Sequence, residues 1–260
     1  MIRSCILRDR DLPDWLIDGE PFGERDSDLA YDRLFVRLAK LRSAVVALER
    51  QHVEVCIARV EELDRESIAL RSAFLNWRDD FLSAGVHGRY QTATVVGSGP
   101  WPRLHFYSST VYLYANLTDA TAWLNYFAVC LLLCDTSVRI FQLLQPAFDW
   151  KHELPTRNPD MANLCQGFAA IIPFCLERVK APKALFSDSA TAATVTDPHV
   201  VENKEPMRLY LSGLIVWPLT VVSSLLHCLD DGLQRWARQE LAEMARIKGY
   251  GGLEAVASAP

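Results

Sequence analysis

Thiols and imidazoles are the side chains with the most versatile chemistry in this sequence, and the spacing of the thiols predicts structural roles. The seven cysteines are scattered, and most of them stand inside apolar runs: Cys5, Cys56, Cys130, Cys134, Cys165, Cys175 and Cys228. Cys130 and Cys134 are one helical turn apart, but three leucines separate them, and no Cys-x-x-Cys or paired His stands nearby. We therefore expect buried free thiols in a reducing compartment and no metal site.

The histidines and acidic residues also lack the spacing that catalysis needs. The six histidines are dispersed: His52, His87, His105, His152, His199 and His227. His227 and Cys228 are a base and a nucleophile by type, but their place at the end of an apolar run is typical of a core histidine beside a buried thiol. The acidic doublets Asp79-Asp80 and Asp230-Asp231 stand where helices meet loops, not on an Asp-rich helix end facing a core, as terpene chemistry would need.

Motif searches agree with this interpretation. The sequence contains no Gly-x-Ser-x-Gly, no His-Glu-x-x-His, no phosphate loop and no Gly-x-Gly-x-x-Gly. The Gly97-Ser-Gly99-Pro turn is too short to cradle a nucleotide. We predict that the chain is not an enzyme and has neither catalytic residues nor a cofactor.

The charge of the chain bears on its partners. The formal net charge is -5, the pI is near 5.7, and no cluster of five or six Lys or Arg occurs. A protein that holds nucleic acid by itself needs a basic surface. We therefore predict no direct nucleic-acid contact by this chain.

The charged run Arg8 to Asp11 closely follows Met1, so we expect no secretory signal.

Two helical stripes dominate the first third of the chain. The first stripe has steps of four and three, and the second keeps this rhythm after a slip near Gln51-His52, which predicts two helices. The stripes consist of Leu34, Leu38, Leu41, Val45 and Leu48, and of Cys56, Val60, Leu63, Ser67, Leu70, Phe74 and Trp77. An intramolecular core face is our interpretation, and a homodimer through a coiled coil is the alternative.

The rest of the chain predicts further helices separated by long loops. Residues 107 to 145 and 159 to 179 are expected to be helical, with Pro173 bending or breaking the second helix. Residues 84–105 are interpreted as a loop, although Tyr90 to Val96 is a short β-type run without a clear partner. Residues 181–206 are interpreted as a second mobile loop. We predict an all-α fold, an irregular multi-helix bundle with long buried central helices and long surface loops.

The run from Leu209 to Leu229 is uncharged and long enough to span a membrane. It contains Pro218 and several polar residues, and no pair of aromatic and basic anchors flanks it. A buried central helix is therefore our interpretation, and we predict no membrane; a membrane-associated protein remains a third hypothesis. Pro218 would free the carbonyl of Leu214 and bend the helix.

Such a bend can shape a cavity. The candidate residues of an effector pocket are Trp123, Asn125, Trp217, Pro218 and Trp236. The alternative is a bent core helix without a ligand.

The first 27 residues form an acidic strap or tail before the helical domain at 28–257. Bulky apolar residues such as Trp15 and Phe22 alternate there with acidic ones. This alternation occurs in amphipathic activation segments. We favour a strap that docks Trp15 and Phe22 onto the helical body.

Four segments, in this order, resemble a known family. They are Trp77 at the end of a long helix, Tyr107 to Leu133 with Trp123 and Asn125, Leu164 to Phe174, and Trp217-Pro218-Leu219 followed by Trp236 through Gly249. This arrangement is similar to the regulatory domain of fungal zinc-cluster transcription factors, the family with a six-cysteine, zinc-binuclear cluster. Leu124 between Trp123 and Asn125, and the lack of a Ser after Cys165, depart from the family's pattern.

The resemblance implies a transcription regulator or cofactor in the nucleus. Its partners would be other transcription regulators or coactivators, or a small-molecule effector. The sequence has no Cys-x2-Cys-x6-Cys run, so it lacks the zinc cluster with which the family reads DNA. Either the domain lost or never had that module, or the sequence is a fragment. The alternative function is an all-α small-molecule binding protein or enzyme of fungal secondary metabolism.

Overall fold

A computed structural model provides the structure of the chain. It describes residues 2–8, 10–23, 25–50, 57–83, 90–95, 99–145, 159–180, 195–196, 199–200, 209–225, 229 and 231–248. Helices dominate these residues, which confirms the predicted all-α class, and short strands form two small sheets.

The chain divides into two compact units. The N-terminal unit comprises Met1–Ala84 and Val129–Met161, and the C-terminal unit comprises Gly85–Ala128 and Ala162–Pro260. The predicted strap at 1–27 therefore belongs to the same unit as the first long helices, and the predicted domain at 28–257 is divided between both. Helix α4, Leu117–Leu144, contributes its first part to the C-terminal unit and the rest to the N-terminal unit.

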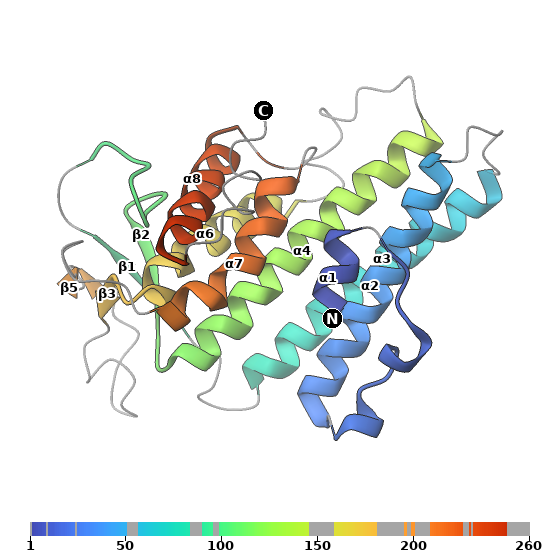
Figure 1. Cartoon of the computed structure of the whole chain (residues 1–260), viewed down its shortest axis with the longest axis horizontal. Coiled ribbons are helices and arrows are strands. Elements are labelled where there is room, and N and C mark those ends of the chain that lie inside the picture. The colour runs from blue at the N-terminus through green and yellow to red at the C-terminus, as the bar shows by residue number, and fades with distance from the viewer. Residues whose placement is uncertain are drawn as a thin grey trace. The chain divides into compact units, whose positions relative to one another are not determined.

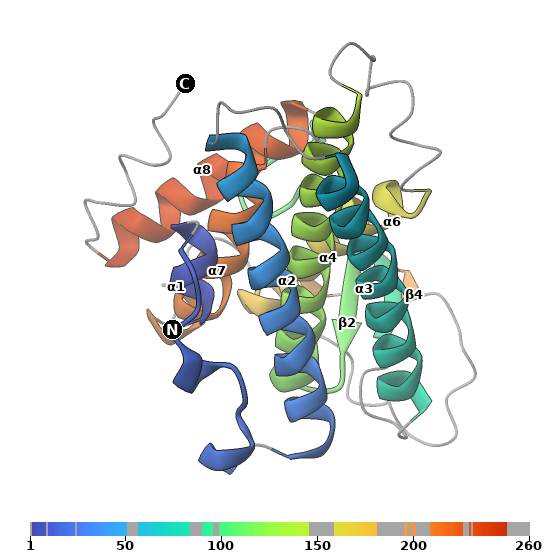
Figure 2. The same cartoon turned by 90° about the vertical axis from the view of Figure 1, so that its right-hand side faces the viewer.

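Long helices build the N-terminal unit. Helices α2, Asp26–Arg50, and α3, Ile57–Ser83, run antiparallel beside the second part of α4 (Figure 2). The second predicted stripe is confirmed where it is described, because Val60, Leu63, Ser67, Leu70 and Phe74 are the buried residues of α3. The break predicted near Gln51-His52 falls in 51–56, outside the described residues, between the end of α2 and the start of α3.

The segment before α2 contains helix α1, Ile2–Leu7, and the short 3-10 turns η1, Asp14–Leu16, and η2, Glu20–Phe22. Ile6 of α1 is buried. Trp15 is 55% exposed, so the docking of its indole onto the helical body stays a prediction. Arg33 of α2 pairs with both Asp18 and Glu20 of this segment. The side chain of Phe22 lies outside the described residues.

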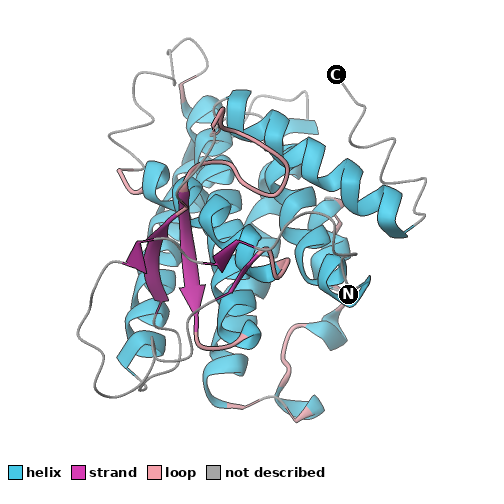
Figure 3. Cartoon of the chain, turned by 90° about the vertical axis from the view of Figure 1, so that its left-hand side faces the viewer, coloured by secondary structure: helices cyan, strands magenta, loops and turns pink. Residues whose placement is uncertain are grey.

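A β-hairpin belongs to the C-terminal unit. Strand β1, Tyr90–Thr94, pairs antiparallel with β2, Thr110–Tyr114, and β1 also pairs in parallel with β4, Val195–Thr196. Strands β3, Val179–Lys180, and β5, His199–Val200, form the other sheet (Figure 3). The loop prediction for 84–105 is therefore wrong at Tyr90–Thr94. The β-type run does have a partner, in a segment that was predicted to be helical.

Helix α4 begins ten residues later than predicted, at Leu117 instead of Tyr107. Thr110–Tyr114 contains two β-branched residues and two tyrosines, which favour a strand there. Asn116 then caps the helix: its Oδ1 accepts a hydrogen bond from the Asp119 N–H at 2.8 Å, and its Nδ2 donates to Asp119 Oδ2 at 2.9 Å. The first bond is that of an N-cap residue, and the second joins the two side chains rather than a side chain and the backbone N–H of the N-cap, as a capping box would have it.

The remaining helices of the C-terminal unit are α6, Met161–Cys175, α7, Leu209–Ser224, and α8, Asp231–Lys248 (Figure 1). Helix α6 ends two residues after Pro173, and α7 contains Pro218. Helices α7 and α8 pack against each other. Gln234 of α8 donates to the carbonyls of Ser223, at 3.4 Å, and of Leu225, at 2.8 Å, which satisfies acceptors at the end of α7.

The second predicted loop, 181–206, lies mostly outside the described residues; Val195–Thr196 and His199–Val200 within it are strands. Among the described residues, α4 is the helix whose length and composition would allow it to cross a membrane, and 78% of its most apolar stretch is buried inside the protein. In the described part of the run that the sequence marked as long enough to span, 209–229, the helix is the shorter α7.

Candidate functional site

Helix α8 presents one buried face, and an acidic residue stands at its centre. The buried residues of α8 are separated alternately by three positions and by one: Leu233, Trp236, Ala237, Glu240, Leu241, Met244 and Ala245. This is the stripe of an amphipathic helix. Glu240 is fully buried within the stripe, and a buried carboxylate requires hydrogen-bond donors.

His105 supplies both donors. Glu240 Oε1 accepts a hydrogen bond from the His105 backbone N–H at 2.5 Å, and Glu240 Oε2 lies 2.9 Å from the ring Nδ1. Both side chains are almost completely buried, at 3% and 0% exposure. The two residues are 135 positions apart in the chain, so this pair joins α8 to the turn before β2.

The turn that carries His105 has an unusual backbone. Arg103 and Phe106 exchange hydrogen bonds of 2.8 and 2.9 Å, which closes a four-residue turn. His105, the third residue of this turn, has a φ of 68°, a value that turns of this kind usually give to Gly. The two bonds to Glu240 hold His105 in this conformation. Strained residues are concentrated at functional sites, which makes this turn a candidate.

Aromatic and cationic side chains surround the turn. The Arg103 guanidinium lies over the rings of Trp101, at 4.4 Å, and of Phe106, at 4.8 Å. The indole N–H of Trp236 donates to the Arg103 carbonyl at 3.2 Å, and its ring contacts Tyr107 with centroids 5.5 Å apart. Trp236, one of the predicted pocket residues, therefore fixes α8 to this turn.

Glu243 completes the charged surroundings. Hydrogen bonds from Arg246 hold the pKa of the Glu243 carboxyl below its usual range, and the charges of Arg246, His105 and the buried Arg178 lower it further. By residue type His105 and Glu240 form a base–carboxylate dyad. Because neither side chain has access to a substrate, the arrangement acts as a structural clamp.

Trp123, another predicted pocket residue, lies in a separate aromatic cluster. Its ring contacts those of Tyr90, Tyr126 and Phe127, with centroids 5.8, 5.4 and 5.6 Å apart. Asn125, two residues further along α4, donates from Nδ2 to the carbonyl of Thr121, one turn earlier, at 2.8 Å. Trp217 and Pro218 are buried in α7. The structure thus places Trp123 and Trp236 against different aromatic partners.

A buried polar atom lies beside the Trp123 cluster. The hydroxyl of Tyr114 is buried and has no hydrogen-bond partner in the described structure. Its ring contacts Tyr90, at 5.7 Å, and Phe174, at 5.6 Å. Burial raises the pKa of Tyr114 well above its ordinary value, and the nearby Cys175, Tyr90, Tyr112 and Asp119 raise it further. A small hydrogen-bonding molecule or a water would satisfy this hydroxyl.

The cysteines of α4 lie in an apolar environment. Cys130 and Cys134 are buried, and burial raises the pKa of the Cys134 thiol to about 12. In the part of the chain that the structure describes, no group of three or more His, Cys, Asp or Glu could hold a metal ion.

Neither His105 nor Glu240 was among the predicted site residues, although the sequence carries a signal for Glu240. The α8 periodicity places Glu240 on the buried stripe, which signals the need for a donor. The identity of the donor was not accessible, because His105 stands 135 residues earlier among dispersed histidines. The capping pair Asn116 and Asp119 was accessible, since its spacing is a helix-start pattern.

Comparisons with known proteins add no relative. No protein-family model matches the chain, and neither a curated protein nor a solved structure matches it.

Proposed function

We propose that the chain is a transcription regulator or cofactor that acts through partner proteins, with a nuclear location and without DNA binding of its own. The observation that carries the proposal is the packing of the two segments most similar to the fungal regulatory domain. Trp217-Pro218-Leu219 lies buried in α7, and the segment that begins at Trp236 forms most of α8. These helices pack on each other, and Trp236 is 1% exposed.

The chemistry of the described residues supports a binding role over a catalytic one. The strained turn at His105 is clamped by a buried carboxylate and leaves no exposed reactive group. The net charge of -5 favours protein partners over nucleic acid, whose phosphates repel an acidic surface.

A chromatin-association assay on the tagged full-length protein tests this proposal. Nuclear and cytosolic fractions would be compared, and the proteins that co-purify would be identified by mass spectrometry. Recovery in nuclei with other transcription regulators is expected. A cytosolic or membrane-bound protein without such partners would overturn the proposal.

A test variant and a control variant accompany that assay. Trp236→Ala removes the indole that joins α8 to the Arg103 carbonyl, so we expect it to lose the co-purifying regulators. Ile57→Ala changes a side chain on α3 that is 66% exposed, so we expect it to retain them. Equal recovery of both variants would show that the association does not depend on the α7–α8 segment.

A small-molecule effector is a second candidate, and the buried hydroxyl of Tyr114 favours it. The effector would be uncharged and able to hydrogen-bond, because the surroundings are aromatic apart from Asp119, Cys175 and the tyrosine hydroxyls. Native mass spectrometry of the purified protein would detect it as an added mass. We expect Tyr114→Phe to abolish this mass; a wild-type protein of unmodified mass would exclude a retained effector.

A further inference from the structure

One face of helix α3 is exposed and carries two large apolar side chains. Ile57 is 66% exposed and Ile68 is 57% exposed, the two highest values among the large apolar residues that the structure describes. They are eleven residues apart, which is close to three turns of an α-helix, so they lie on the same face. We call the exposed residues of this face the α3 stripe, and they are Ile57, Ala58, Glu61, Arg65, Ile68 and Ala69.

The α3 stripe lies on the opposite side of the helix from the apolar stripe that the sequence predicts. Val60, Leu63 and Leu70 of that predicted stripe are buried within the chain. A homodimer through those residues, the alternative that the sequence left open, would therefore require the N-terminal unit to come apart. The α3 stripe is already accessible to a second copy.

The α3 stripe carries one acidic and one basic side chain. Among the described residues, the Glu61 carboxylate has no ion-pair partner, and Arg65 donates from Nε to the Glu61 carbonyl at 3.4 Å, not to its carboxylate. Arg59 and Glu62 of the same helix, which lie outside the stripe, form an ion pair with each other. The two charges of the stripe are thus available to a partner.

The spacing of the α3 stripe is the same in both directions along the helix. Its six residues are separated by steps of one, three, four, three and one, and the midpoint is at the level of Leu63. An antiparallel second copy, related by a two-fold axis at this level, would place the partner's Arg65 opposite Glu61. The partner's Glu61 would lie opposite Arg65 in the same way.

The apolar residues of the stripe fit the same arrangement. The two-fold axis sets each isoleucine opposite an alanine of the other copy, so large side chains meet small ones. A two-fold interface requires this kind of self-complementarity, because the same surface is used by both copies. A parallel arrangement would set Glu61 against Glu61 and Arg65 against Arg65, and like charges in contact oppose association.

We propose that the α3 stripe is the contact between two copies of this chain, arranged antiparallel around the level of Leu63. One helix from each copy makes a small interface, so the dimer should dissociate on dilution, with a Kd on the order of 1 to 100 µM. The inference goes beyond the proposed function, because it concerns the assembly of the chain and uses no residue of the α7–α8 segment.

Analytical ultracentrifugation of the purified full-length chain over a range of concentrations tests the proposal. The wild type is expected to pass from monomer to dimer as the concentration rises. Ile68→Asp should weaken the dimer about tenfold or more, because it sets a charge against apolar side chains of the other copy.

Exchanging the charges of the stripe tests the antiparallel arrangement. Glu61→Arg alone makes the stripe basic and Arg65→Glu alone makes it acidic, so each single variant should weaken its own dimer about tenfold. An equal mixture of the two variants should recover a dimer, because each copy supplies the charge that the other lacks. In a parallel dimer, either single variant would leave like charges against like, as in the wild type, and would change little.

Controls separate association from folding. Arg59→Glu makes the same charge change as Arg65→Glu on the same helix, about 120° away around its axis, and should keep the wild-type dimer. Ile68→Asp should keep the helical circular dichroism of the wild type, because this side chain is mostly in water in the monomer.

The other outcomes contradict the proposal. A wild type that remains monomeric at every concentration would overturn it, and loss of a co-purifying protein in Ile68→Asp would then assign the stripe to a different partner. A dimer that Ile68→Asp leaves intact would mean that another surface makes the contact. A dimer that Ile68→Asp dissolves but both single charge variants leave intact would overturn the antiparallel arrangement.

Discussion

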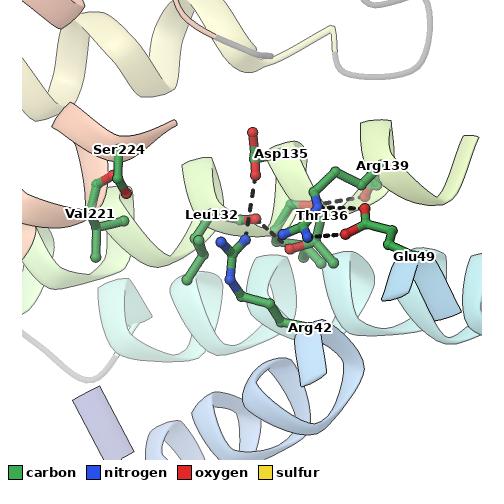
Figure 4. A network of polar contacts seen from close by, with 10 residues as sticks. Arg42, Glu49, Leu132, Asp135, Thr136, Arg139, Val221 and Ser224 are labelled. Atoms are coloured by element: carbon green, nitrogen blue, oxygen red, sulfur yellow. Dashed lines mark hydrogen bonds and ion pairs between the residues drawn. The ribbon is translucent and has the colours of Figure 1, made fainter. Parts of the chain in front are cut away.

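The two units hold their helices together with different kinds of polar contact. In the N-terminal unit, Arg42–Asp135 and Arg139–Glu49 are ion pairs between helices (Figure 4), and the second of them has a partly exposed carboxylate. The Glu49 side chain is 31% exposed. In the C-terminal unit the corresponding pair, His105–Glu240, is completely interior. Water can replace a lost partner at an edge but not inside, so similar residue types carry different energetic weight.

Removing one carboxylate from each unit should give the largest difference in the free energy of unfolding. Glu240→Ala leaves the N–H and ring nitrogen of His105 buried without an acceptor, so we expect a loss of about 3 to 5 kcal/mol in the free energy of unfolding. Glu49→Ala removes a carboxylate that is itself 31% exposed, and we expect a loss of about 1 kcal/mol or less. Urea denaturation followed by circular dichroism measures both values.

Thiol labelling locates the effect. Cys175 in the C-terminal unit and Cys134 in the N-terminal unit are both buried, and burial raises the pKa of each thiol. Glu240→Ala should speed the labelling of Cys175 more than that of Cys134. Equal acceleration would indicate global unfolding, and equal stability losses for the two carboxylate variants would remove the proposed distinction between the units.

Close helix packing in the C-terminal unit predicts the next effect. A Cβ added at Gly167 of α6 would lie 2.5 Å from Cζ of Phe127 in α4. Gly167→Ala should therefore cost about 1 to 3 kcal/mol through overpacking. In the N-terminal unit, a contact between α3 and α4 is made by two small side chains, because the hydroxyls of Ser67 and Ser137 hydrogen-bond at 2.6 Å.

Gly213 is the matched control for this prediction. It is exposed in α7, so Gly213→Ala should stabilise by up to about 1 kcal/mol through helix propensity. Replacing Phe127 by Leu should relieve part of the cost of Gly167→Ala, which a double-mutant cycle would measure. Stabilisation by Gly167→Ala would mean that the two helices are further apart than the structure has them.

Both units contain a buried tyrosine hydroxyl without a partner in the described structure, Tyr31 and Tyr114. Removing an unsatisfied buried hydroxyl should stabilise the protein by about 1 to 2 kcal/mol. We therefore expect Tyr31→Phe to raise the thermal midpoint, and Tyr114→Phe to do so unless a molecule is bound there. Opposite signs for the two variants, measured by calorimetry, would identify the Tyr114 hydroxyl as a ligand contact.

The same contrast explains how much the sequence could predict. The N-terminal unit consists of long helices whose buried positions repeat every three or four residues, so the stripe through Val60 and Phe74 was visible. The C-terminal unit depends on pairs that are distant in sequence. Tyr90 finds its partner at Tyr114, and Glu240 finds His105, and no local pattern names either partner.

The contacts of the first segment were also beyond a local pattern, because Asp18 and Glu20 pair with Arg33, which stands 13 to 15 residues later in the chain. The pocket residues were predicted from the bend at Pro218, and a bend in one helix does not reveal which aromatic rings surround Trp123 and Trp236.

Among the described residues of the C-terminal unit, two that are not Gly have positive φ, and they should respond in opposite ways to glycine. Glu177, with φ 54°, follows the end of α6, where the Arg178 N–H donates to the Pro173 carbonyl at 2.8 Å. Gly is preferred at this position after a helix, so Glu177→Gly should stabilise by about 1 kcal/mol. His105→Gly should destabilise, because it removes the ring bound to Glu240. Thermal midpoints that move in the same direction would contradict this distinction.

The smallest expected effect is a pH dependence at the hairpin. Burial, with a smaller contribution from the neighbouring Tyr90 phenol, raises the pKa of Tyr112 to about 12. An unfolded tyrosine ionises near pH 10, so between about pH 10 and 12 the unfolded chain releases a proton that the native state retains. This group therefore leaves stability unchanged below about pH 10 and lowers it as the pH rises further. Thermal midpoints from pH 8 to 11.5 should fall less steeply in Tyr112→Phe than in the exposed control Tyr210→Phe. Equal slopes would mean that the Tyr112 phenol is exposed to water and that burial does not raise its pKa.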